Sequence, residues 1–519
     1  MGVPSIGIGA SAGGLEALRE FVSAIRPDSG FCYVIIQHFA PDHTSLLDKI
    51  LQESCAVPVT MILPGDKLLP NRVYVNPPGK LVTLDEEDFV LEEQPRVAGL
   101  RTPINQFFVS LANSLGSDAY AVVLSGTGTD GTSGVREIKS VGGVVVAQKS
   151  QTAKFAGMPD SVISKGLTDF VLPPADIPGS LLDLRQFKEA GLSPALENNG
   201  SERIEQALPE IVQLLTDAGL SDFSGYKTGT LSRRVLRRMG LMRKATLTSY
   251  LELLRESNDE RISLSQDFLV GVTRFFRDPD GYAALREHVL PQLLDRQQDH
   301  LRIWVPGCST GEEVYSLAFM IQSMIEEKRS SMTFQIFGTD VDMEALKTAR
   351  GGIYTKEALA EVSDDDVARF FNETQQSYQV KLGVRESCLF APHNLLHDPP
   401  FSRIDLISCK NLLIYLNEQA QAAIIPRFHY ALNPESFLAL GPSESTSYGE
   451  EMFHALDRRH RIYKRNDSAV ERFSALRTNP ALSRGDLRTQ HFMPDKFGAN
   501  AHSTSLEGLI ERQYVQVAA

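Results

Sequence analysis

Residues 301–316, LRIWVPGCSTGEEVYS, constrain the fold more than any other stretch of this chain. The apolar run RIWV predicts a short buried strand, which ends at Pro306-Gly307 in a loop of small residues. A helix is expected next, because Glu312 and Glu313 would lie in its first turn, where the helix dipole favours negative charge. Strand, glycine loop and helix in this order are typical of a nucleotide pocket in an open α/β sheet.

The residues around this loop indicate what the pocket binds. Gly311 has no Cβ and lets the backbone approach a ligand closely. The next apolar strand, TFQIFGTDVD, ends at Asp340, which would accept hydrogen bonds from ribose hydroxyls. The acids beside the loop disfavour a phosphate and favour a positively charged ligand, and S-adenosylmethionine, a sulfonium with an α-ammonium, fits. The alternative is a loop that only packs the helix against the sheet.

Composition limits the class of protein. With 519 residues the chain exceeds one core, so two or three domains are expected. The five unclustered cysteines indicate reduced thiols without zinc-type spacing, and no metal is expected. A net charge of -13 disfavours nucleic acid as a partner. No apolar run approaches the roughly 20 residues that span a bilayer, and no targeting segment is recognised, so a cytoplasmic protein without membrane insertion is expected.

The first half carries a candidate nucleophile. The sequence Gly9-Ala10-Ser11-Ala12-Gly13 matches the G-x-S-x-G nucleophile elbow, although its glycines fit a phosphate-cradling turn equally well. The next strand, FCYVIIQH, ends at His38, and the strand DAYAVVLSG leads to Asp130. In a parallel sheet these three residues would share one edge. The set favours acyl-transfer hydrolysis, with Ser11 attacking a carbonyl, His38 carrying its proton and Asp130 orienting His38.

Four motifs in this half resemble the catalytic domain of the chemotaxis receptor methylesterase, CheB, over about residues 3–183: GIGASAGG, IIQHFAPDHTS, LSGTGTDGTSG and AKFAGMPDSVI. The resemblance implies that Ser11, His38 and Asp130 hydrolyse glutamate methyl esters on chemoreceptors and deamidate certain glutamines. That family usually has methionine at the position of Thr127, whose backbone N–H helps hold the oxyanion. It normally carries a receiver domain too, for which this chain has no room before Ser11, so phosphorylation control within the chain is not expected.

A polar linker, predicted at residues 186–200, leads into a segment with helical spacing, and a small all-α domain is predicted over residues 201–270. This segment contains a dense basic face, Arg233, Arg234, Arg237 and Arg238. The face is either solvated or docks an acidic helical partner. Nucleic acid is disfavoured here because aromatic residues are sparse.

Further polar residues follow the later strands. CLFAPHNLLHDPP supplies Asn394 and Leu395, and RIDLISCKNLLIYL leads to Lys410 and Asn411, with Tyr415 one helical turn on. Polar residues at several strand ends predict one ligand lying across that edge of the sheet.

Over about residues 200–466 the chain resembles the chemotaxis receptor methyltransferase, CheR, through FSGYKTGTLSRR, VTRFFRDP, GCSTGEE, GTDVD, NLL, CKNLLIYL, LGPSES and HRIYKR. The resemblance implies transfer of a methyl group from S-adenosylmethionine to receptor glutamates, with S-adenosylhomocysteine as product. It assigns the cofactor contacts to Thr273, Arg277, Glu313, Asp340, Asn394, Leu395, Lys410 and Asn411. The family often has asparagine at Gly271 and arginine at Lys410, so weaker cofactor affinity is expected.

The predicted architecture is α/β: a parallel-sheet, Rossmann-like esterase domain over residues 1–185, the all-α domain, and a Rossmann-like methyltransferase domain over residues 271–466. A linker and a terminal helix are predicted over residues 467–519, where truncation is suspected. A carboxylate is already a nucleophile at neutral pH, so methyl transfer needs placement more than a base. Arg277 and Tyr415 are expected to hold the acceptor carboxylate in line with the cofactor.

These features predict a bifunctional enzyme that writes and erases methyl esters on glutamate-bearing helices of chemoreceptors or other sensory proteins. In one alternative, one half is degenerate and acts as a docking or regulatory module. In another, a small-molecule methyltransferase is fused to a general esterase.

Overall fold

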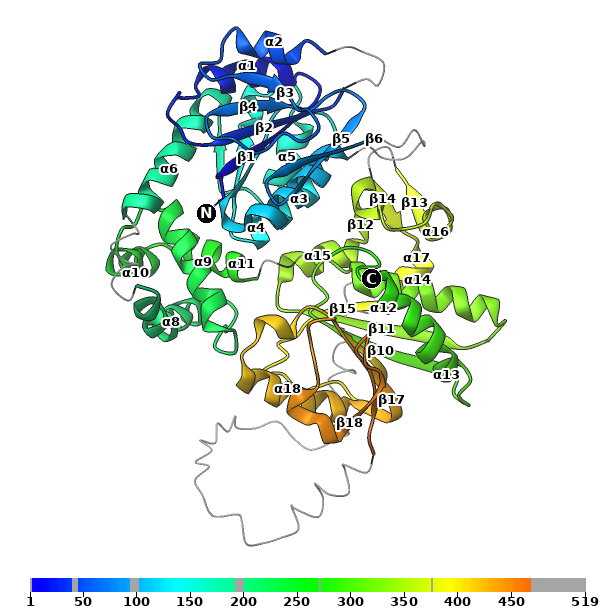
Figure 1. Cartoon of the computed structure of the whole chain (residues 1–519). Coiled ribbons are helices and arrows are strands. Elements are labelled where there is room, and N and C mark those ends of the chain that lie inside the picture. The colour runs from blue at the N-terminus through cyan, green and yellow to red at the C-terminus, as the bar shows by residue number, and fades with distance from the viewer. Residues whose placement is uncertain are drawn as a thin grey trace. The chain divides into compact units, whose positions relative to one another are not determined.

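The computed structural model describes residues 2–39, 45–93, 102–191, 200–269, 271, 273–374 and 377–467. The chain divides into two compact units (Figure 1). One comprises Met1–Arg274, Tyr354–Val367 and Glu373–Gln379, and the other comprises Phe275–Ile353, Ala368–Asn372 and Val380–Ala519. Each unit contains a seven-stranded sheet.

The first sheet is parallel throughout, with strand order β3-β4-β2-β1-β7-β8-β9. All six residues of its central strand β1 are buried, as expected for a parallel sheet that helices cover on both faces. The strands are β1 (Ser5–Ala10), β2 (Cys32–Gln37), β3 (Val59–Met61), β4 (Arg72–Val75), β7 (Ala119–Val123), β8 (Val144–Gln148) and β9 (Phe170–Leu172). A separate hairpin pairs β5 (Lys80–Asp85) with β6 (Asp88–Glu93).

Each face of this sheet has its own hydrophobic cluster. Because side chains alternate along a strand, Ile35 of β2 packs with Phe21 on one face, whereas Val34 packs with Phe107 and Phe108 on the other. The helices are α1 (Gly14–Ser23), α2 (Leu47–Gln52), α3 (Pro103–Leu115), α4 (Thr132–Ser140), α5 (Gly157–Ile163) and α6 (Ile177–Gly191). The predicted parallel-sheet fold is therefore confirmed for this region.

The predicted all-α domain belongs to the same unit. It consists of α8 (Gly200–Asp217), α9 (Thr228–Leu241), α10 (Leu247–Glu256) and α11 (Asn258–Phe268). Its own hydrophobic cluster includes the fully buried Phe223 and Tyr250. Thr246 and Ser257 cap α10 and α11, because their side chains accept from backbone N–H groups of the first turn. Of the predicted linker, residues 192–199 lie outside the described residues.

The second unit has a mixed sheet in the order β15-β11-β10-β16-β17-β19-β18. Five strands are parallel: β10 (His300–Pro306), β11 (Thr333–Asp340), β15 (Cys388–Pro392), β16 (Ile404–Cys409) and β17 (Leu432–Leu440). The hairpin of β18 (Phe453–Asp457) and β19 (Ile462–Arg465) adds an antiparallel edge. The helices are α12 (Pro279–Ala284), α13 (Leu290–Leu294), α14 (Glu312–Glu327), α15 (Met343–Gly351), α17 (Leu382–Arg385) and α18 (Glu418–Ala431).

Several short elements lie at the sequence positions where the assignment of the chain changes from one unit to the other. They are β12 (Ile353–Tyr354), α16 (Asp364–Phe370), β13 (Phe371–Glu373) and β14 (Tyr378–Val380). The predicted terminal helix lies outside the described residues, which end at position 467.

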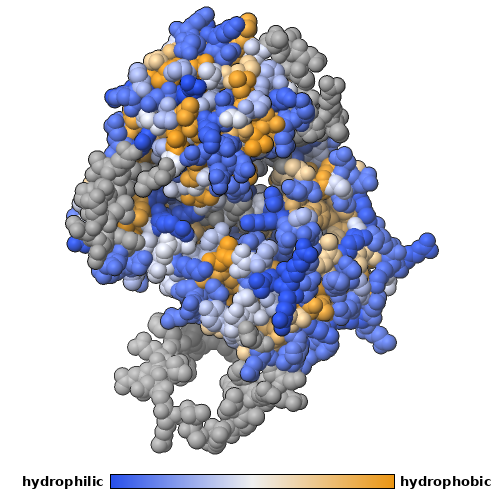
Figure 2. Space-filling model, viewed as in Figure 1, coloured by the Kyte–Doolittle hydropathy of each residue, from blue (hydrophilic) through white to orange (hydrophobic). Residues whose placement is uncertain are grey.

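Hydrophilic residues cover most of the visible surface, with hydrophobic patches between them (Figure 2). Among the described helices, none has both the length and the apolar character needed to span a bilayer.

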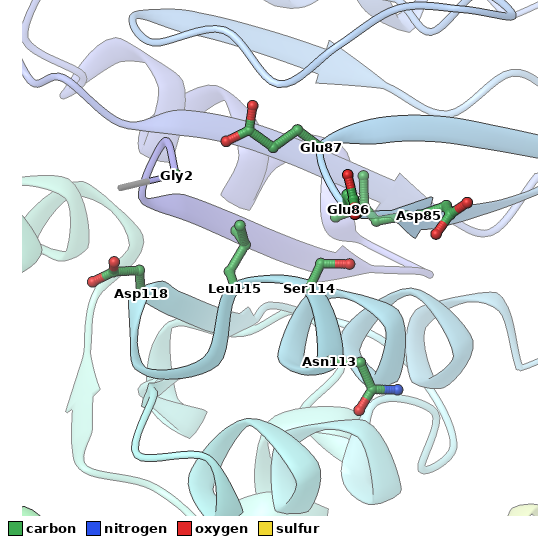
Figure 3. A pocket seen from close by; sticks show the side chains of 9 residues that line it. Gly2, Asp85, Glu86, Glu87, Asn113, Ser114, Leu115 and Asp118 are labelled. Carbon is green, nitrogen blue, oxygen red and sulfur yellow. The ribbon is translucent and has the colours of Figure 1, made fainter.

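A pocket of about 570 Å³ opens in the first unit beside the beginnings of β1 and β7 (Figure 3). Its lining includes the carboxylates of Asp85, Glu86, Glu87 and Asp118. The candidate nucleophile follows the carboxyl end of β1, so the pocket lies at the opposite end of these strands. None of the residues predicted for either active site lines this pocket.

Candidate active sites

Three polar residues meet at the carboxyl ends of neighbouring strands in the first sheet. Ser11 follows β1, His38 follows β2, and Asp130 lies in the loop between β7 and α4. The Nδ1 atom of His38 lies 3.0 Å from Ser11 Oγ, and its Nε2 atom lies 2.8 Å from Asp130 Oδ2. The central position of β1 between β2 and β7 brings the three side chains into one hydrogen-bonded row.

Asp130 is buried and fixed by backbone groups. Its carboxylate accepts from the N–H groups of Ile104 (3.1 Å), Asn105 (2.9 Å) and Gly131 (2.8 Å). The first two donors belong to the first turn of α3, where the helix dipole favours a negative charge. A carboxylate held there accepts the Nε2–H of His38, which leaves Nδ1 to accept from the Ser11 hydroxyl.

The backbone around Ser11 is equally fixed. The Ser11 N–H donates to the Ser125 carbonyl (3.0 Å), and Gln37 Nε2 donates to the Ser11 carbonyl (3.1 Å). A Cβ on Gly126 would lie 2.9 Å from Ser11 Cβ and 2.2 Å from Met158 Sδ, so only glycine fits at this position.

Thr127 follows Gly126 and is exposed. Its role as a backbone oxyanion donor stays a prediction.

Two buried polar residues behind the nucleophile, Ser125 and Gln148, were not predicted from the sequence. The Ser125 hydroxyl donates to the Ala12 carbonyl (3.1 Å) and accepts from the Phe155 N–H (3.0 Å). Gln148 Oε1 accepts from the Ser125 N–H (2.8 Å). Each residue follows directly on an apolar run, VVL before Ser125 and VVVA before Gln148, and this position is what the sequence offered to find them.

In the second unit, the loop after β10 has an unusual backbone. Gly307, Ser309 and Gly311 all have positive φ, at 68°, 48° and 94°. The Ser309 N–H donates to Asp340 Oδ2 (2.7 Å), and Asp340 Oδ1 accepts from the Asp342 N–H (2.9 Å). Burial raises the pKa of the Asp340 carboxyl, and these hydrogen bonds oppose the shift. Asp340 therefore holds the glycine loop in addition to its predicted contact with ribose.

Glu313 lies in the first turn of α14 and is half-buried, with most of its surface covered. Its Oε1 accepts from the Ser408 hydroxyl (2.6 Å). Desolvation by burial raises the pKa of Glu313 to about 7, against the lowering effects of Lys410, Ser408 and Arg277. A carboxylate in such surroundings gains stability when a ligand cation pairs with it.

Lys410 follows β16, and its side chain is only 6% exposed. Its Nζ lies 3.6 Å from Asp278 Oδ2 and 4.5 Å from the centre of the Tyr282 ring, but it has no hydrogen-bond partner among the described residues. A buried ammonium without a hydrogen-bond acceptor is costly, so the site is suited to a ligand acceptor. The carboxylates of Glu313 and Asp340 and the ammonium of Lys410 together fit the α-ammonium, hydroxyls and carboxylate of S-adenosylmethionine.

The remaining predicted residues follow neighbouring strands of the second sheet. Asn394 and Leu395 follow β15, and Asn411 follows Lys410 with φ 59°. Tyr415 ends a short 3₁₀ helix, Leu413–Tyr415. The strands β15, β11, β10 and β16 are parallel, so the residues that follow them share one edge. Thr273 is the exception among the predicted contacts, because it belongs to the first unit.

Arg277 lies between two residues in the left-handed region, Phe276 (φ 48°) and Asp278 (φ 69°). Such a conformation is uncommon for non-glycine residues and is costly for a bulky side chain such as Phe276. The Phe276 N–H donates to the Ser316 hydroxyl (2.9 Å), and the Asp278 side chain caps α12. Strain held by surrounding contacts is typical of functional sites, and here it flanks the predicted acceptor-binding arginine.

Glu444 was not predicted to have a role, although it belongs to the LGPSES motif. This carboxylate is buried and accepts from the N–H groups of Leu413 (2.7 Å), Gly441 (2.7 Å) and Asn411 (3.0 Å). Glu444 therefore fixes the loop that carries Lys410, Asn411 and Tyr415. In the sequence, this role is indicated only by the position of an acid shortly after an apolar strand.

The structure corrects the predicted basic docking face. Arg237 and Arg238 are only 5% and 7% exposed and pair with acids of α11. Arg234 donates to two backbone carbonyl groups of the esterase region, and of the four arginines Arg233 alone is exposed. The prediction of an open basic face was wrong, because buried acids neutralise Arg237 and Arg238 and backbone carbonyls hold Arg234.

Family models match the chain in three consecutive segments. They are CheB methylesterase over residues 6–181, the all-alpha domain of CheR methyltransferase over residues 207–269, and the SAM binding domain of CheR methyltransferase over residues 271–462.

Three known proteins illustrate the similarity. An uncharacterized 104.1 kDa protein of Rhodobacter capsulatus is 37% identical over 437 residues, which are 80% of this chain and 46% of that protein, so the chain spans less than half of that relative. A chemotaxis protein methyltransferase of Listeria monocytogenes is 32% identical over 44% of this chain and 85% of its own length. The crystal structure of the Thermotoga maritima CheB methylesterase catalytic domain is 30% identical, covers 36% of this chain and 100% of its own, and has a TM-score of 0.34.

The order of the matched segments agrees with the fold, in which a parallel-sheet domain and four helices precede a second α/β sheet. The chain therefore belongs to the CheB methylesterase family over its first domain and to the CheR methyltransferase family over the two that follow.

Proposed function

We propose that this chain both removes and adds methyl esters on glutamate side chains of chemoreceptors or related sensory proteins. The observation that carries the proposal is the pairing of two chemistries, each at the carboxyl edge of its own sheet. At one edge lies the hydrogen-bonded triad of Ser11, His38 and Asp130. At the other edge lies the proposed cofactor site, which contains Glu313 and Lys410.

In the esterase, His38 Nδ1 takes the proton of Ser11 as Oγ attacks the ester carbonyl. His38 then gives this proton to the departing methanol, and the acyl group stays on Ser11. A water molecule, deprotonated in turn by His38, releases the glutamate carboxylate. Asp130 accepts the Nε2–H and stabilises the imidazolium in both steps, and the backbone N–H of Thr127 donates to the oxyanion.

In the methyltransferase, S-adenosylmethionine supplies an electrophilic methyl group when it is bound. Glu313 pairs with the ligand ammonium, Asp340 accepts from ribose hydroxyls, and Lys410 donates to the ligand carboxylate. The proposed contacts also include Thr273, Asn394, Leu395 and Asn411. Arg277 and Tyr415 would hold the acceptor glutamate, so that its carboxylate oxygen could take the methyl group without a general base, with S-adenosylhomocysteine as the leaving group.

The substrate assignment rests on the family. Chemotaxis methyltransferases are among the similar proteins, and the resemblance to CheB and CheR implies a glutamate methyl ester as the group that both halves handle. Joining the two activities raises the effective concentration of each near a shared substrate.

Separate assays of the full chain test the two halves. Hydrolysis of a peptide that carries a glutamate methyl ester is expected to release methanol and to be lost in Ser11→Ala. Methyl transfer at saturating cofactor is expected to fall in Arg277→Ala and to be unchanged in Arg286→Ala, which alters an exposed arginine on the same unit. Methanol release that survives in Ser11→Ala, or full turnover by Arg277→Ala, would contradict the corresponding assignment.

A further inference from the structure

Helix α9 of the helical domain contacts the esterase domain through arginines that the sequence marks as a free basic face. Arg234 donates from its two Nη atoms to the carbonyl oxygens of Lys139 and Ser140, each at 2.6 Å. Both carbonyls lie at the end of α4, where a helix leaves its last C=O groups without intrahelical partners; that of Lys139 also accepts from the Gly142 N–H (3.1 Å). A guanidinium at this end also matches the negative pole of the helix dipole.

Arg237, one turn further along α9, lies in a buried charge cluster. It pairs with Asp169 of the esterase domain and with Asp267 of α11, the latter at 2.6 Å, and donates to the Gly143 carbonyl at 3.1 Å. Lys139 Nζ lies 3.4 Å from Asp267 Oδ1 and 3.9 Å from Asp169 Oδ1. Each of the four charged side chains is at most 8% exposed. Two cations and two carboxylates from both domains therefore neutralise each other out of water.

Apolar side chains cross the same boundary in both directions. Leu241, at the end of α9, belongs to the hydrophobic cluster of the esterase sheet together with Leu181 and Leu182 of α6. Conversely, Phe187 of α6 packs against the hydrophobic cluster of the helical domain. The contact thus combines a buried ionic cluster with an apolar seam, and apolar contact between two domains restricts their relative motion.

We infer that the esterase domain is the resident partner of α9. Arg234 and Arg237 hold the helical domain on it in solution, so this surface is closed to an acidic helix of another protein. The inference concerns a region that matches the methyltransferase family but is bound to the esterase domain. It does not depend on the activity proposed for either half.

Hydrogen–deuterium exchange of the full chain tests the inference. Removing Arg237 leaves Asp169 and Asp267 buried with less compensating charge, which destabilises a buried pair strongly. Arg237→Ala is therefore expected to speed exchange more than tenfold in α9 and also at the end of α4 and in residues 141–146. Arg233→Ala, an exposed arginine on the same helix, is expected to leave these rates unchanged.

The decisive readout is exchange on the esterase side. If Arg237→Ala speeds exchange only in α9 and α11, the cluster serves the helical domain internally and the inference fails. If this variant does not fold, Arg234→Ala replaces it, because the Arg234 side chain is only half-buried. The exchange rates at the end of α4 in Arg234→Ala then decide the inference. A polyglutamate peptide is expected not to bind the wild-type chain through these arginines. If the peptide does bind, and a folded Arg237→Ala chain no longer binds it, the inference is overturned.

Discussion

Lowering the pH from 8 to 6 is expected to weaken cofactor binding through Glu313. Burial raises the pKa of this carboxyl to about 7 in the ligand-free chain. A ligand ammonium beside it stabilises the carboxylate, so the pKa falls in the complex. Binding below pH 7 therefore requires that Glu313 release a proton.

The size of the effect follows from the pKa. With a pKa of about 7, roughly 0.9 of the carboxyls are protonated at pH 6 and roughly 0.1 at pH 8. Binding is then coupled to the release of about 0.9 proton at pH 6, and the Kd at pH 6 is about tenfold higher than at pH 8. The opposite holds for stability: the ligand-free folded chain takes up this proton more readily than the unfolded chain, so this contribution is lost as the pH rises through 7.

Titration calorimetry with S-adenosylhomocysteine, which retains the α-ammonium, measures both quantities. Two buffers with different ionisation enthalpies report the number of protons released at each pH. Glu313→Gln is expected to bind weakly and with no pH dependence, whereas Glu327→Gln, at the exposed end of the same helix, is expected to retain it. A wild-type Kd that is equal at pH 6 and pH 8, or a pH dependence that survives in Glu313→Gln, would refute the reasoning.

Three further substitutions have defined outcomes. Asp130→Asn is expected to lower esterase kcat by ~10³–10⁴-fold, because an amide does not stabilise the imidazolium as a carboxylate does. Gly126→Ala is expected to abolish ester hydrolysis, since its Cβ would lie 2.9 Å from Ser11 Cβ and 2.2 Å from Met158 Sδ. Glu444→Gln is expected to raise the Kd for S-adenosylhomocysteine at least tenfold, because it loses at least one charge-assisted hydrogen bond worth about 1.5–3 kcal/mol.

Each of these variants has a matched control. Methyl transfer by Asp130→Asn and Gly126→Ala is expected to remain at the wild-type rate, and a parallel loss would mean global unfolding. Glu451→Gln changes an exposed acid in the same region and is expected to leave the Kd unchanged. Wild-type affinity in Glu444→Gln would show that the loop after β16 needs no anchoring by this carboxylate.

Much of both predicted sites follows from one rule: residues that follow parallel strands lie at one edge of the sheet. Ser11, His38 and Asp130 are far apart along the chain, but each follows an apolar strand, and parallel pairing brings such positions to one edge. The same rule places Asp340 and the loop that leads to Glu313 at one edge of the second sheet. Local patterns were sufficient there because the topology, and not a specific tertiary contact, determines which residues meet.

Local patterns were insufficient where the outcome depends on a distant partner. The spacing of Arg237 and Arg238 marks a charged helix face, but their burial depends on Asp169, Glu260 and Asp267. Glu444 is likewise an ordinary acid in sequence, and its role appears only when three backbone N–H groups converge on it. Both cases involve charge that is buried only because the fold supplies the compensating group.

The most direct test of the account follows a labelled methyl group through both active sites. The full chain is incubated with S-adenosylmethionine labelled on the methyl group and a chemoreceptor preparation, and base-labile protein label and free methanol are measured together. The wild-type chain is expected to yield both, whereas Ser11→Ala is expected to accumulate protein-bound label and to release no methanol above the rate without enzyme. Label confined to a small molecule, or methanol release by Ser11→Ala at the wild-type rate, would contradict it.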